Sequence, residues 1–169
     1  MTIPIFSDSH GEGYRAEYVF ERLKKFSDYP KTALFLGDGA RDIEDGIPNG
    51  CELLSVAGNC DVWTSLFDDQ GNEIPDERIE FFEGLKIFMT HGHKYYVKTS
   101  LVEAIRRARE LDADILLFGH THQPLLRELP ADEKHPKRLI MFNPGSLRAG
   151  SFGLLTVVNG TPLLSHGEI

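Results

Sequence analysis

One pattern recurs along this chain and constrains its fold: a short apolar run that ends in side chains able to bind a metal ion. Its clearest copy is the run Ile115–Phe118, which leads directly into Gly-His-Thr-His at residues 119–122. An apolar run that ends in glycine is typical of a buried strand that delivers a loop. In extended chain, His120 and His122 point to the same side. Two imidazoles so placed form a metal-ligand arrangement, although two surface histidines in a turn would share this pattern.

Four other predicted strands, at residues 3–6, 32–36, 52–57 and 86–89, end in the same way. In open α/β sheets, ligands bind at the carboxyl ends of the strands. Each ending alone has a plainer interpretation, such as a helix-capping aspartate or a turn built on asparagine or glycine. The polar side chains that follow these four strands are Asp8 and His10, Asp38, Asn59, and His91 with His93.

The remaining pattern predicts an α/β protein. Apolar residues at helical spacing predict a helix over residues 14–26 and a second over 100–111, which Ser100 and Glu103 open as a capping box. Residues 78–82 and 86–89 are expected to form a β-hairpin. Residues 62–78 before it are expected to be mainly a polar loop. Further strands are predicted at residues 125–129, 138–142, 153–158 and 162–165.

Length and composition exclude several classes of protein. The chain has 169 residues, which predicts a single domain over residues 1–169, and its net charge of −8 argues against a broad nucleic-acid or anionic-membrane surface. The two cysteines, Cys51 and Cys60, form no disulfide framework and suit a reducing compartment. Neither a signal segment nor an apolar run of membrane-spanning length is evident. We expect a cytoplasmic protein.

Together the strand ends supply seven oxygen and nitrogen ligands and no thiolate. Seven ligands are too many for one tetrahedral ion, and they suit two adjacent ions that share a bridging carboxylate. Two such ions about 3.5–4 Å apart can clamp both the attacking and the leaving oxygen of a phosphoryl displacement. The predicted ligands are Asp8, His10, Asp38, Asn59, His91, His120 and His122.

This ordered set of motifs resembles the calcineurin-like metallophosphoesterase family, and most of all its small bacterial and archaeal single-domain phosphodiesterase branch. The resemblance runs from residue 8 to residue 122, and the Asn-Pro-Gly-Ser turn at 143–146 also fits. It implies a four-layer αββα sandwich, in which two mixed sheets are flanked by helices and the site lies at the carboxyl ends of the strands.

The resemblance also implies a ligand set for each ion and a mechanism. Asp38 would bridge the two ions, and a metal-held hydroxide would attack the phosphorus of a phosphodiester in line. Asp38 and Asn59 would thereby also serve catalysis. One ion would be held by Asp8, His10, Asp38 and His122, and the other by Asp38, Asn59, His91 and His120.

The sequence departs from the broader family at Cys60. Many members have a histidine there that is thought to assist the leaving group, whereas the smaller phosphodiesterase branch is similar to this chain in having cysteine. Protonation of the leaving oxygen then falls to another group, to water or to none. We take His93 as a catalytic candidate that contacts a ligand or the phosphate, and a purely structural His93 is the alternative. A nucleophilic Cys60 would need a base and a lowered pKa that the sequence does not show.

Two alternative functions share this fold. One is a non-catalytic scaffold similar to the retromer subunit, whose metal site is degraded, and the other is a phosphomonoesterase. The intact ligand set favours an enzyme with two divalent ions, which the resemblance suggests are manganese, with iron, zinc, nickel and cobalt as alternatives. The expected substrate is a small phosphoester, a nucleotide among the candidates. The family resemblance also suggests a homo-oligomer.

Overall fold

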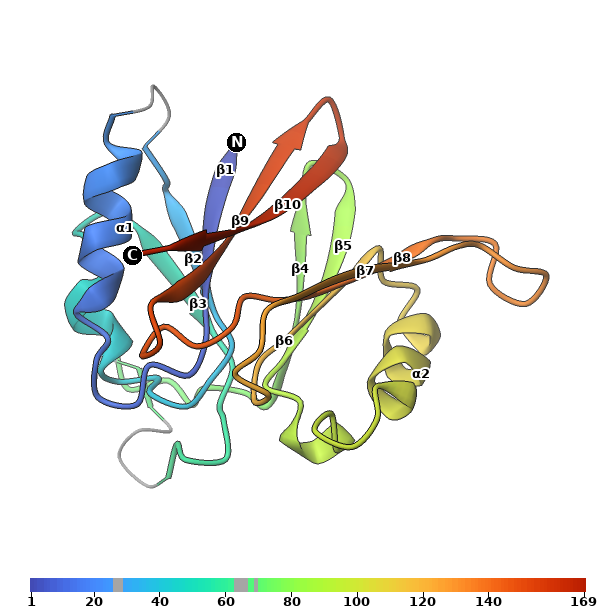
Figure 1. The fold of residues 1–169 in the computed structure, drawn as a ribbon, viewed down its shortest axis with the longest axis horizontal. Coiled ribbons are helices and arrows are strands. Elements are labelled where there is room, and N and C mark those ends of the chain that lie inside the picture. Colours follow the sequence, from blue (N-terminus) through green and yellow to red (C-terminus); the bar gives the residue numbers. More distant parts are fainter. Residues whose placement is uncertain (26–28, 63–66, 69) are drawn as a thin grey trace.

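The computed structural model describes residues 1–25, 29–62, 67–68 and 70–169. Two five-stranded sheets pack face to face. Helix α1 (Arg15–Leu23) covers the outer face of the first sheet, and helix α2 (Val102–Glu110) covers the outer face of the second (Figure 1). The expected four-layer αββα sandwich is therefore confirmed.

The first sheet has the strand order β10-β9-β1-β2-β3. Strands β1, β2 and β3 are parallel, with Ile5 opposite Leu34 and Leu34 opposite Leu54, whereas β9 and β10 are antiparallel. Parallel strands end at one edge of a sheet, so the loops that follow β1, β2 and β3 emerge side by side. The strands are β1 (Thr2–Phe6), β2 (Thr32–Phe35), β3 (Glu52–Ser55), β9 (Ser151–Val158) and β10 (Thr161–Glu168).

The second sheet has the order β4-β5-β6-β8-β7, in which β5, β6 and β8 are parallel. The predicted hairpin is present as β4 and β5, and its turn residues Glu83 and Gly84 both have positive φ, at 48° and 85°. This is the conformation that two-residue hairpins favour. The strands are β4 (Glu77–Phe82), β5 (Leu85–Thr90), β6 (Ile115–Phe118), β7 (Leu125–Leu129) and β8 (Leu139–Asn143).

The continuous apolar runs of the central strands are explained by burial on both faces. In β6, Ile115 and Leu117 point into the core between the sheets, whereas Leu116 and Phe118 point toward α2. In β2, Leu34 likewise faces the core between the sheets, and its neighbours pack under α1. Alternation along each strand thus fixes the two sheets and the two helices in one stack.

Some element boundaries differ from the prediction. Helix α1 ends at Leu23, and residue 26, the predicted end, lies outside the described residues. The capping box is wrong in detail, because the Ser100 hydroxyl accepts the N–H of Val102 while the Glu103 side chain pairs with Arg106. Residues 63–66 and 69 of the expected loop also lie outside the described residues.

Within the described ranges, no helix is both long and apolar enough to cross a membrane.

Candidate metal centre

The carboxyl ends of five strands meet at one edge of the sandwich, and all seven predicted ligands lie there. The first sheet contributes the loops after β1, β2 and β3, and the second contributes the loops after β5 and β6. Atom-to-atom distances of 3.1–3.9 Å link the seven side chains into one connected cluster. The sequence pattern therefore identified a real spatial cluster.

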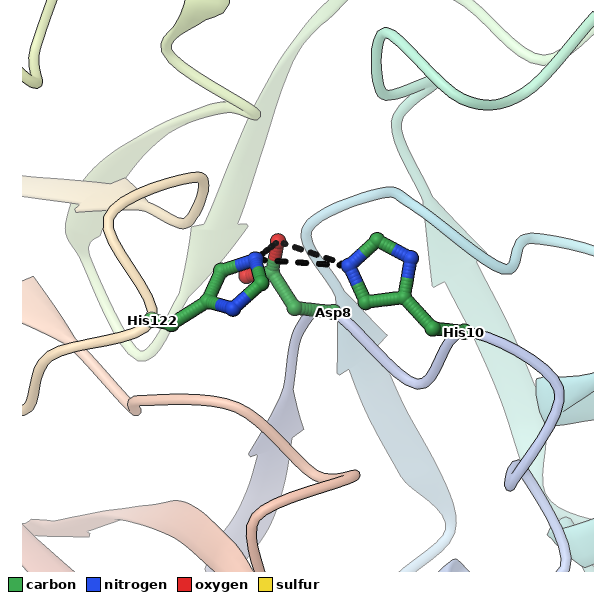
Figure 2. A group of neighbouring side chains, drawn as sticks. All are labelled: Asp8, His10 and His122. Atoms are coloured by element: carbon green, nitrogen blue, oxygen red, sulfur yellow. Dashed lines mark hydrogen bonds and ion pairs between the residues drawn. The ribbon is translucent and has the colours of Figure 1, made fainter.

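Asp8, His10 and His122 form the first part of this cluster, and both rings direct a nitrogen at the carboxylate (Figure 2). Asp8 Oδ1 lies 3.1 Å from His122 Nε2 and 3.9 Å from His10 Nε2, and the two nitrogens are 3.3 Å apart. The other oxygen, Oδ2, accepts the Ser7 hydroxyl at 2.6 Å and the His120 N–H at 3.1 Å. Oδ1 is buried without a hydrogen-bond partner among the described residues, so one oxygen is anchored and the other is left for a ligand.

Asp38, Asn59, His91 and His120 form the second part. His91 Nδ1 lies 2.7 Å from the Leu36 carbonyl oxygen, which can only accept, so Nδ1 carries the proton and Nε2 faces the cluster. His91 Nε2 lies 3.3 Å from Asp38 Oδ2, 3.2 Å from Asn59 Oδ1 and 3.1 Å from His120 Nδ1. Several acceptor atoms thus converge, an arrangement that a cation stabilises.

Asp38 lies between the two parts. Its Oδ2 is 3.8 Å from His10 Nε2 as well as 3.3 Å from His91 Nε2. Its Oδ1 is held from the other side by the Cys60 backbone N–H at 2.7 Å. The exposed fractions of Asp8, Asp38 and His91 are 0%, 2% and 0%, so these three side chains are shielded from solvent, whereas the His122 side chain is 46% exposed and Asn59 is exposed.

The backbone at the cluster is strained. Asp8, His10, Asp38, His120 and His122 all have positive φ, between 44° and 66°. Non-glycine residues in this left-handed region cost about 1–3 kcal/mol each and persist where the surrounding structure holds them. Gly119 shows how closely the loops approach, because a Cβ there would lie 2.0 Å from the Ser7 hydroxyl oxygen. These unfavourable backbone conformations orient the five side chains toward the cluster.

The loop after β2 is held by Asp61, to which the sequence analysis gave no role. Asp61 Oδ2 accepts the backbone N–H groups of Asp38 and Gly58, both at 2.8 Å. Asp61 Oδ1 accepts those of Gly39 at 2.8 Å and Ala40 at 2.9 Å. Its side chain therefore fixes the position of Asp38. The signal was its place two residues after Asn59, but that spacing does not distinguish a ligand from a support.

Burial and mutual charge set the protonation of the cluster. Burial raises the pKa of Asp8 above its ordinary value. Burial also acts to raise the pKa of Asp38, but the hydrogen bond and charge of His91 outweigh it and hold that pKa below the usual range. Burial acts to lower the pKa of His91, which the Asp38 carboxylate nevertheless raises. Burial and the charge of His91 lower the pKa of His120 to about 4, so its imidazole is neutral at pH 7.

His93 and Cys60 border the cluster. The His93 ring centroid lies 5.4 Å from that of His91, and its Nδ1 is buried without a hydrogen-bond partner among the described residues. Burial lowers the pKa of His93. Cys60 is exposed, and its Sγ lies 3.3 Å from Asn59 Nδ2. Although the residue is exposed, partial desolvation of the sulfur and the charge of Asp38 raise the pKa of Cys60, so its thiol is protonated at neutral pH and is a poor nucleophile.

Solved structures share this fold at low sequence identity. That of an archaeal phosphodiesterase has a TM-score of 0.67 and 22% identity, with 98% of this chain and 99% of that chain covered. Vacuolar Protein Sorting 29 from Cryptosporidium parvum has a TM-score of 0.67 and 18% identity, with 99% and 97% covered. At these identities, the likeness establishes the fold alone.

Sequence comparison establishes the family. The probable metallophosphoesterase YsnB of Bacillus subtilis strain 168 is 30% identical over 165 residues, which cover 94% of this chain and 86% of the relative. The model of the calcineurin-like phosphoesterase superfamily domain matches residues 1–160, nearly the whole chain. This protein therefore belongs to the calcineurin-like phosphoesterase superfamily.

Proposed function

We propose that this protein is a metal-dependent phosphodiesterase with two divalent ions at the cluster. The observation that carries the proposal is the connected set of seven ligand-type side chains, in which anchored carboxylates and histidines direct their remaining acceptor atoms at one another. Such convergence is unfavourable without a cation. The superfamily to which the chain belongs acts on phosphoesters and binds divalent metals, which supports the proposal.

The donor set fits two ions that share Asp38. Asp8, His10, Asp38 and His122 would hold one ion, and Asp38, Asn59, His91 and His120 would hold the other. Both sets mix carboxylate oxygen with imidazole nitrogen, which suits manganese and the later first-row ions. We propose manganese, with iron, zinc, nickel and cobalt as alternatives. When bound, such ions lower the pKa of water and stabilise charge on the attacking and leaving oxygens.

The protein itself contributes orientation and proton placement. The Leu36 carbonyl oxygen fixes the His91 tautomer by accepting from Nδ1 at 2.7 Å. The Cys60 N–H and the Ser7 hydroxyl each occupy one oxygen of a carboxylate and leave the other for an ion. His93, whose pKa burial lowers, is neutral at pH 7 and can hydrogen-bond a phosphoester oxygen. These groups pre-organise the site before substrate arrives.

Cys60 supports a diester rather than a monoester substrate. A phosphomonoester has two negative charges at neutral pH, whereas a diester has one. The position that many relatives fill with histidine here has a neutral thiol, because burial and the charge of Asp38 raise its pKa. Residue 60 therefore provides no positive charge to balance the second negative charge of a monoester. The solved archaeal phosphodiesterase of the same fold is consistent with this preference.

The scaffold alternative rests on the likeness to Vacuolar Protein Sorting 29, which shows the fold alone. All seven positions in this chain have side chains that can ligate, and the structure brings them together. A degraded site would leave gaps in this set. We therefore place the enzymatic function first.

The proposal is tested with metal-stripped protein, a chromogenic phosphodiester and the matching monoester, with Mn²⁺, Ni²⁺, Zn²⁺ and Mg²⁺ added back separately. We expect metal-dependent hydrolysis, with the diester preferred by about tenfold or more, which equals ~1.4 kcal/mol of transition-state free energy. Thermal melting in the same samples measures binding independently, because an ion at 100 times its Kd stabilises by about 2.7 kcal/mol. Bound metal without turnover of either ester would refute the enzymatic proposal.

A Cys60→Ala variant separates this mechanism from a thiol nucleophile. Alanine retains the backbone N–H of residue 60, which donates to Asp38 Oδ1 at 2.7 Å, and removes only the thiol that also interacts with this carboxylate. We expect kcat/KM for the diester to change by about threefold or less, equivalent to ~0.7 kcal/mol. Loss of nearly all turnover, with a trapped covalent intermediate in the parent protein, would instead identify Cys60 as the nucleophile.

A further inference from the structure

We infer that Asn143, at the end of β8, is a positioning residue for the metal site, an inference that rests on the metal binding proposed above. Asn143 begins a turn, residues 143–148, that forms hydrogen bonds to two loops with predicted ligands. These are the loop after β1, which contains Asp8, and the loop after β6, which contains His120 and His122. We call residues 143–148 the bracing turn. It contributes none of the seven predicted ligands.

The Asn143 amide holds the loop after β6. Its Nδ2 donates to the Gly119 carbonyl at 2.9 Å and to the Thr121 hydroxyl at 3.1 Å. Its Oδ1 accepts the Gly145 N–H at 2.9 Å, which fixes the orientation of the amide. Asn143 is 0% exposed, so its polar atoms depend on these partners. A carboxylate lacks the donor, and an apolar side chain lacks both functions.

The other end of the bracing turn holds the loop after β1. The Ser146 hydroxyl donates to the Asp8 carbonyl at 2.8 Å, and the Arg148 N–H donates to the same oxygen at 3.3 Å. The Leu147 N–H donates to the Ser7 carbonyl at 2.8 Å. One short segment is therefore hydrogen-bonded to the backbone on both sides of the pair Asp8 and His122, whose side chains lie 3.1 Å apart.

These loops need such support because their backbone is strained. Asp8, His120 and His122 have φ values of 54°, 66° and 59°. Left-handed non-glycine residues persist only where contacts over-determine them. A further hydrogen bond, 2.8 Å long, runs from His166 Nε2 on β10 to the Asn143 carbonyl, and the His166 ring stacks on Phe142 at 4.5 Å. The bracing turn is thus itself fixed to the sheet of β1.

The inference predicts a specific pattern of Mn²⁺ affinities in metal-stripped protein, measured by isothermal titration calorimetry without substrate. Groups that orient ligands typically change metal affinity by about 10–100-fold when removed. Asn143→Ala should lower the affinity for both ions by about that factor, since the loop that Asn143 holds supplies one ligand to each ion. Ser146→Ala should lower only the affinity for the ion that Asp8 would hold. A general loss of stability would not lower the affinity of one ion site and leave the other unchanged.

Two controls make the result decisive. Val19→Ala, in helix α1 and 0% exposed, destabilises the fold away from the site and should leave both affinities unchanged. Asn49→Ala, an exposed asparagine just before the amino end of β3, controls for loss of an amide. Wild-type affinities in Asn143→Ala, or an equal loss in Val19→Ala, would overturn the inference while the proposed function stands. Absence of Mn²⁺ binding by the wild type would overturn both.

Discussion

Replacing Asp38 by asparagine is expected to abolish metal-stimulated phosphodiester hydrolysis while the metal-free protein remains folded. The amide oxygen can still accept the Cys60 N–H, but the amide nitrogen then takes the place of Oδ2, 3.3 Å from His91 Nε2 and 3.8 Å from His10 Nε2. The shared anionic ligand is lost from both proposed ions. We expect kcat/KM to fall by about 10³-fold or more, equivalent to ~4 kcal/mol.

Steady-state kinetics at saturating Mn²⁺ measures this loss, and thermal melting separates it from unfolding. The metal-free variant should melt within a few degrees of the parent, and the rise in Tm that metal produces in the parent should be largely lost. Asp132→Asn, a matched change on the exposed loop after β7, should leave the kinetics unchanged. Retention of parental turnover by Asp38→Asn would exclude Asp38 as the shared ligand.

Replacing Asp61 by alanine is expected to cause the largest loss of stability, even in metal-free protein. Asp61 is 5% exposed and accepts four backbone N–H groups, from Asp38, Gly39, Ala40 and Gly58. An unsatisfied buried donor costs ~1–3 kcal/mol. Water can reach some of these groups in the variant, so we expect unfolding free energy to fall by about 4 kcal/mol rather than by the full sum. Tm should fall by roughly 8–16 °C.

Urea unfolding and calorimetry of the metal-free variants measure this effect. Asp61→Asn should lose about half as much unfolding free energy as Asp61→Ala. The amide keeps one oxygen that accepts two N–H groups, whereas its NH₂ group replaces the other oxygen and cannot accept. Asp45→Ala, an exposed aspartate in the short 3₁₀ helix after β2, should stay within ~0.5 kcal/mol of the parent. A loss below ~1 kcal/mol in Asp61→Ala would show that solvent replaces these hydrogen bonds.

Much of the architecture was predictable because local patterns and tertiary packing agree. The run Ile115–Phe118 was predicted as a strand and is β6, with all four residues buried. Parallel strand ends meet at one edge of each sheet, so ligand-type residues placed after apolar runs were expected to converge. The pairing of the two sheets came from the family resemblance, because strand order depends on contacts between residues distant in sequence.

The supporting groups could not be predicted in the same way. Asp61, Asn143 and Ser146 act through hydrogen bonds to backbone, and turn residues of these types are common without such roles. The left-handed conformations of His120 and His122 likewise depend on loops held together from both sheets. Sequence reasoning thus finds the groups that face the site more readily than the groups that hold them.

The division of the ligands between the sheets has a consequence for the lifetime of the folded state. Asp8, His10, Asp38 and Asn59 follow strands of the first sheet, whereas His91, His120 and His122 follow strands of the second. An ion held by the proposed ligands of both groups would cross-link the two sheets at one edge, and the sheets could not separate there until a coordinate bond broke. We therefore expect metal loading to slow unfolding, so that the metal-loaded protein resists proteolysis for longer than its equilibrium stability alone implies.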